Sequence, residues 1–143
     1  MPATFESFGI RFLYPDNWTV AQRGEDESDE GLTLELPSGG FFSIELEDEG
    51  HSDDEVIKRV EEAIRVEYHE VETEEVALND ASEDERCVDM RFYYLDLLII
   101  SRLVLVKRDA ETLIVQIQSE SRDFDQNEPV FNAILKQIRP TSQ

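Results

Sequence analysis

Carboxylates are the most numerous residues of this chain that could do chemistry, and they fall into four clusters. The clusters span residues 25–30, 45–55, 70–75 and 83–85. Neighbouring carboxylates can act as general acid and base, bind cations or dock a basic protein. Because acidic pairs occur along so much of the sequence, no pair by itself identifies a catalytic site. The first cluster supplies these candidate partner-binding residues: Glu25, Asp26, Glu27, Asp29 and Glu30.

Calcium binding is the first alternative reading of these clusters. A calcium loop of the EF-hand type needs a bidentate acid six residues after its central glycine. Pro37 and Val56 stand at that distance from Gly31 and Gly50, so neither stretch fits the pattern. A weak, low-affinity cation site within residues 45–54 remains an alternative.

Histidine and cysteine are scarce. His51 and His69 are isolated in acidic stretches, and no Ser-His-Asp or Cys-His order can be built around them. Cys87 is the single cysteine, so it has no partner for an internal disulfide or a cysteine-rich zinc site. We therefore expect Cys87 to pack in the core, and we predict no catalytic residue, no cofactor and no metal. The chain is expected not to be an enzyme.

The composition predicts one globular domain over residues 1–143. The chain has 143 residues, 40% of them hydrophobic, and 13 Lys+Arg against 34 Asp+Glu give it a formal net charge of −21. Such a charge repels phosphate backbones and anionic headgroups, so neither nucleic acid nor a membrane is an expected partner. A basic protein is the natural counterpart, whereas adaptation to a salty environment would produce the same acidic coat without a docking role. No oligomeric state follows from the sequence.

The start of the chain shows no targeting signal. The opening MPATFESFGIRF has neither a basic segment nor the apolar stretch of a secretory signal. The longest apolar run, residues 97–100, is far too short to span a membrane. We expect a cytoplasmic protein.

Alternating apolar residues predict a mostly antiparallel sheet of six or seven strands. The expected strands are residues 9–13, 32–36, 42–46, 71–76, 86–94, 97–107 and 113–118, and the chain is also expected to be extended at 18–20. One expected turn, at Leu95-Asp96, has an unusual composition, because tight hairpin turns normally contain Gly or Asn and neither is present there. Phe41 and Phe42 are also candidate partner contacts, because adjacent residues of a strand face opposite ways and one of the two rings then needs cover.

Helical spacing predicts two main helices. Val56, Val60 and Ile64 mark an apolar stripe on a helix that begins at Ser52 or Asp53 and ends near Glu67. A second helix is expected to open at 128–129, with proline tolerated at its first position, and to stop at Pro140. Strands with a middle and a terminal helix indicate an α+β layered domain.

Three stretches of the chain resemble the Mog/PsbP-like superfamily. They are residues 8–18, where a strand is followed by the Pro-x-x-Trp of Pro15 and Trp18; the long central hairpin; and the terminal helix at 131–139. The resemblance, which extends to DcrB-like bacterial domains, implies an α/β/α sandwich. It also implies a non-enzymatic binding or accessory module, and it brings no catalytic residues.

The predicted function is a non-enzymatic protein-interaction or accessory module that binds a basic protein partner through its acidic surface. An inhibitor or immunity-type protein, in which negative charge mimics nucleic acid, is a special case. The alternative from another class is a small-ligand-binding or enzymatic domain with a pocket between the sheet and a helix.

Overall fold

The computed structural model describes residues 2–21, 31–47, 51–78, 81, 84–108 and 111–139. Two helices lie in this part of the chain, α1 (Asp53–Glu67) and α2 (Ser121–Ile138). The strands are β1 (Ala3–Ser7), β2 (Ile10–Tyr14), β3 (Thr19–Val20), β4 (Gly31–Glu35), β5 (Phe41–Glu47), β6 (Glu72–Glu75), β7 (Arg86–Tyr94), β8 (Leu97–Arg108) and β9 (Glu111–Glu120).

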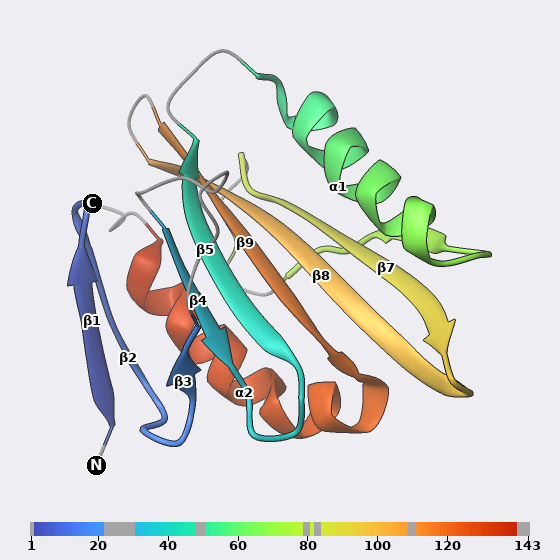
Figure 1. The fold of residues 1–143 in the computed structure, drawn as a ribbon. Helices are drawn as coiled ribbons and strands as arrows, with labels where there is room; N and C mark the ends of the chain where they lie inside the picture. The colour runs from blue at the N-terminus through green and yellow to red at the C-terminus, as the bar shows by residue number, and fades with distance from the viewer. Residues whose placement is uncertain are drawn as a thin grey trace.

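A seven-stranded antiparallel sheet forms the middle layer, in the order β3-β4-β5-β9-β8-β7-β6 (Figure 1). The last strand of the chain, β9, lies in the centre, where it pairs with β5 on one side and β8 on the other. The predicted α+β class, with its mostly antiparallel sheet and two main helices, is confirmed.

The first two strands form a hairpin of their own, and the first of them was not predicted. Phe5 lies opposite Phe12 in the register of β1 and β2, and their rings are 5.2 Å apart. The segment Ala3–Ser7 contains a single large apolar residue, so its alternation was too weak to indicate a strand.

One face of the sheet is covered by α2 together with the β1–β2 hairpin (Figure 1). Trp18 links α2 to the sheet, since its ring lies 5.9 Å from that of Phe131 in α2 and 6.3 Å from that of Phe42 in β5. The backbone N–H of Leu13 in β2 also donates to the side chain of Gln137 in α2, at 2.9 Å.

The other face is covered by α1, over the β7 and β8 half of the sheet (Figure 1). The helix begins as predicted, with a capping box at Ser52. Glu55 N–H donates to the Ser52 hydroxyl at 3.2 Å, and Ser52 N–H donates to the Glu55 carboxylate at 3.0 Å. The hydrogen bond from the Ser52 backbone lowers the pKa of Glu55. With helices on both faces, the layers are α/β/α.

The second helix begins seven residues earlier than predicted, at Ser121 rather than at 128. Its N-cap is Glu120, whose carboxylate accepts hydrogen bonds from the N–H groups of Arg122 and Asp123, at 2.9 and 3.3 Å. Pro129 therefore lies inside the helix. The apolar face spans the proline, with Phe124 and Phe131 both buried, and this packing outweighs the backbone hydrogen bond that a proline cannot donate.

The β7–β8 hairpin turns at Leu95-Asp96, as predicted, and does so without glycine. Both residues have positive φ, 49° for Leu95 and 68° for Asp96. A two-residue hairpin turn of type I′ has left-handed backbone at both positions, which matches the twist of its strands. The long pairing of β7 with β8 holds the two residues in this disfavoured conformation.

Candidate functional site

The candidate residues of the first acidic cluster lie outside the described residues. Glu25, Asp26, Glu27, Asp29 and Glu30 all fall within residues 22–30. Their role as partner contacts stays a prediction.

A different acidic surface is described at the β6 edge of the sheet. All four residues of β6 are exposed, and three of them are glutamates. We call Asp54, Glu72, Glu74 and Glu75 the acidic edge. Arg86 of β7 joins α1 to β6, because its guanidinium donates to Asp54 at 2.7 Å and also to Glu75. These hydrogen bonds raise the pKa of Arg86, so the arginine stays charged.

Phe41 and Phe42 separate to opposite faces of β5, as their adjacency requires. Phe42 is fully buried beneath α2, among the rings of Phe12 and Trp18. It is a core residue and presents no surface to a partner. Phe41 is half-buried on the other face and lines an open groove of about 580 Å³ beside Glu35 and Glu45. Of these two candidate partner contacts, only Phe41 is accessible at the surface.

A buried charged cluster lies between the sheet and α2. Arg102 of β8 donates through Nε to Asp89 Oδ1 at 2.8 Å and through an Nη atom to Asp89 Oδ2 at 3.0 Å. Its other Nη atom donates to Glu128 of α2 at 2.9 Å. The side chains of Arg102 and Asp89 are 8% and 4% exposed. Burial alone would lower the pKa of Arg102, but the hydrogen bonds to Asp89 outweigh it and raise the pKa.

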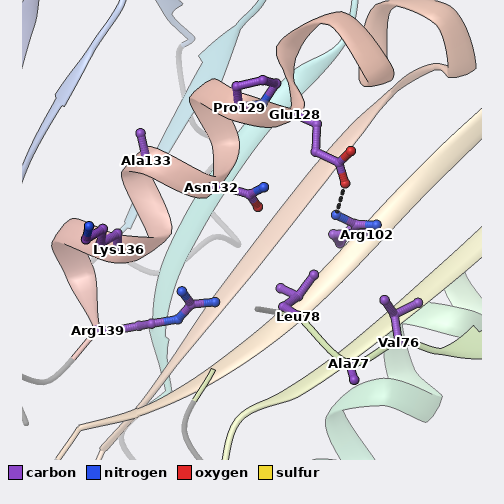
Figure 2. A pocket seen from close by; sticks show the side chains of 10 residues that line it. All are labelled: Val76, Ala77, Leu78, Arg102, Glu128, Pro129, Asn132, Ala133, Lys136 and Arg139. Carbon is purple, nitrogen blue, oxygen red and sulfur yellow. Dashed lines mark hydrogen bonds and ion pairs between the residues drawn. The ribbon is translucent and has the colours of Figure 1, made fainter. Parts of the chain in front are cut away.

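This cluster forms one end of a groove between α2 and the segment that follows β6 (Figure 2). The groove has a volume of about 520 Å³. Its lining residues are Val76, Ala77, Leu78, Arg102, Glu128, Pro129, Asn132, Ala133, Lys136 and Arg139. Figure 2 shows Glu128, Asn132 and Lys136 along α2, with Arg102 of the sheet beside Glu128.

Arg139 lies at the end of α2 and is held firmly in place. Its Nε and one Nη donate to the two oxygens of Glu85, at 2.7 and 2.8 Å. The side chains of this pair are 11% and 1% exposed. Such a bidentate pair fixes the plane of the guanidinium, so the remaining N–H groups of Arg139 have a defined direction.

Sequence reasoning did not find the buried cluster or the groove. The signal available was the charge of Asp89 and Arg102 inside strands whose neighbours are apolar on both faces. A charged residue in a covered strand needs a partner, and residues 89 and 102 are opposite each other in the antiparallel register. Glu128 joins them through tertiary packing that no spacing in the sequence shows.

Cys87 is buried in the core, as predicted. Burial raises the pKa of its thiol to about 12. We expect the native protein to resist alkylation by iodoacetamide at mildly alkaline pH, because the reactive thiolate is almost absent. Labelling followed by mass spectrometry should show modification of Cys87 only after denaturant is added. Labelling of the native protein at the rate of a free thiol would contradict this.

The described residues contain neither a metal-binding cluster nor a membrane-spanning helix. Within these ranges, no three side chains of His, Cys, Asp or Glu converge to hold a metal ion. Neither α1 nor α2 is long and apolar enough to cross a bilayer.

Comparison with known proteins identifies the fold. No protein-family model matches the chain, and no curated protein matches its sequence. Among solved structures, the chain is similar to cyanobacterial PsbP (CyanoP) from Synechocystis sp. PCC 6803, with a TM-score of 0.69 and 11% identity over 98% of this chain and 92% of that one. It is also similar to PA94 of Pseudomonas aeruginosa, a protein of unknown function described as a candidate regulator, with a TM-score of 0.56 and 14% identity over 99% of both chains.

The chain therefore has the PsbP-like α+β fold. The resemblance seen in the sequence is confirmed at the level of the fold, and it extends over nearly the whole chain.

Proposed function

We propose that the protein is a non-enzymatic interaction module that binds a basic protein partner through its acidic edge. The observation that supports this most directly is the exposed strand β6, whose Glu75 shares the guanidinium of Arg86 with Asp54 of α1. The side chains of Asp54, Glu74 and Glu75 are 86%, 62% and 67% exposed. They are accessible to a partner and are already oriented by arginines.

The charge of the acidic edge favours a basic partner over other classes. Two arginines lie among its four carboxylates: Arg86 pairs with Asp54 and Glu75, and Arg91 pairs with Glu74 at 3.0 Å. An excess of negative charge is left over, within a chain of net charge −21. Long-range attraction would steer a Lys- or Arg-rich segment to this surface and would weaken as salt is added.

The position of β6 suggests how such a segment would bind. It is the terminal strand of the sheet, and within the described sheet its backbone is paired only with β7. An extended segment can add to such an edge through main-chain hydrogen bonds, while alternate side chains meet the carboxylates. A strand with Lys or Arg at every second position is therefore the expected ligand.

The test uses a defined peptide of alternating Lys and Thr, titrated into the full chain and followed by backbone amide NMR. We expect shifts concentrated in β6, β7 and α1 that disappear in molar salt. A peptide of alternating Glu and Thr is the control and is expected not to bind. Shifts spread evenly over all exposed acids would mean that the acidity is only a solvated coat.

Matched variants locate the surface. The edge variant carries Glu72→Gln, Glu74→Gln and Glu75→Gln, and the control carries Glu6→Gln, Glu35→Gln and Asp125→Asn, so that both lose three negative charges. We expect the edge variant to lose most of its affinity and the control to keep it. A third variant neutralises the five acids between positions 25 and 30. If only this variant loses binding, the docking surface is that cluster and the acidic edge is not the site.

A further inference from the structure

The lining of the groove between α2 and residues 76–78 is more basic than the protein as a whole. Three of its ten lining residues are Arg or Lys and one is Glu, whereas the whole chain has 13 basic residues against 34 acidic ones. Two further carboxylates, Asp89 and Glu85, lie behind the lining and pair with Arg102 and Arg139. Three basic and three acidic side chains therefore surround the groove, so an added negative charge meets less repulsion there than at the acidic edge, where four carboxylates face two arginines.

The end of the groove formed by Lys136 and Arg139 offers hydrogen-bond donors. Arg139 uses Nε and one Nη on Glu85, which leaves the N–H groups of its other Nη for a ligand. Lys136 precedes it by three residues and lines the same groove. Among the described residues, no acid is paired with the Lys136 ammonium. Figure 2 shows the guanidinium of Arg139 reaching from the end of α2 toward the Leu78 side of the groove.

The rest of the lining is suited to the short apolar part of a small ligand. Val76, Leu78 and Ala133 supply apolar walls, and Asn132 points into the groove from α2 (Figure 2). At about 520 Å³, the groove lies within the range of small-molecule sites, which are about 300–1,000 Å³. At the far end, Arg102 is committed to Asp89 and Glu128, so among the described lining residues the charged donors left for a ligand belong to Lys136 and Arg139.

We propose that this groove binds a small organic carboxylate. Its carboxylate is held by Lys136 and Arg139, and its short apolar body lies against Val76, Leu78 and Ala133. One negative charge fits better than two, because Glu85 and Glu128 lie at the groove and would repel a dianion. This site is separate from the acidic edge and does not depend on the function proposed for it.

Three probes of equal length test the proposal. Hexanoate, hexanamide and hexylammonium are titrated into the full chain, and backbone amide shifts are followed at residues 76–78 and 128–139. We expect hexanoate to bind, with saturating shifts in both segments, and the other two to bind at least about tenfold more weakly, since a charge-assisted hydrogen bond contributes that much. Equal binding of hexanamide would overturn the proposal, because the groove would then recognise only the apolar body.

Two variants with matched controls place the ligand. Lys136→Glu reverses a charge inside the groove, and Lys58→Glu reverses one on α1, where the lysine side chain is 77% exposed. We expect the first to weaken hexanoate by about tenfold or more and the second to leave it nearly unchanged. Asn132→Phe should block the groove, whereas Asp125→Phe on the same helix should not. Equal losses in a variant and its control, or no shifts at millimolar hexanoate, would overturn the proposal.

Discussion

Replacing Asp89 by alanine is expected to lower the free energy of unfolding by about 3–5 kcal/mol, because it leaves the Arg102 charge buried without its main partner. The Asp89 side chain is almost inaccessible, and it accepts two hydrogen bonds from Arg102. Glu128 is 40% exposed and cannot compensate for the loss. Urea denaturation followed by the fluorescence of buried Trp18 would measure the change.

Two further variants separate the buried pair from ordinary surface charges. Arg91→Ala removes a more exposed arginine that lies 3.8 Å from the same aspartate, and it should cost about 1 kcal/mol or less. The double replacement Asp89→Leu with Arg102→Met removes both charges at once and should recover much of the loss. If Asp89→Ala cost no more than Arg91→Ala, the buried pair would not be a significant stabilising contact.

Phe42→Ala and Phe41→Ala are expected to differ strongly, although the two residues are adjacent and chemically identical. Phe42 is 0% exposed and lies among the rings of Phe12 and Trp18, so its truncation should destabilise the fold by about 3–5 kcal/mol. Phe41 is half-buried at an open groove, and its loss should cost about 1 kcal/mol. Thermal unfolding of both variants gives the comparison. Similar losses would mean that the cover over Phe41 is as complete as that over Phe42.

Much of the fold could be predicted from the sequence because its strands alternate clearly. Helix α1 was predicted with its start and end, since an apolar stripe and an N-capping residue agree there. Helix α2 was placed too late, because Pro129 was taken for a first position although packing of Phe124 extends the helix back to Ser121. The strand Ala3–Ser7 was missed because pairing with β2, and not its own pattern, makes it a strand.

Less of the candidate site could be predicted. Acid clusters are visible in any acidic sequence, but which of them lies on an edge strand depends on the order of strands in the sheet. The groove is even harder to predict from the sequence, because Arg102 and Lys136 belong to different elements that meet only when α2 packs on the sheet. The spacing of apolar residues predicts which face of a helix or strand a residue lies on. Contacts between different elements can be known only from the fold.

The central position of β9 has a consequence for the order in which the chain can assemble. Within the described sheet, strands β3, β4 and β5 join the other strands only through β9, which follows all of them in the sequence. On a growing chain, strands β3, β4 and β5 therefore cannot join strands β6, β7 and β8 until β9 has left the ribosome. Pairing between segments so far apart in the sequence slows folding. The pairing of β9 with β5 and β8 is the step that joins the two parts of the sheet into one structure.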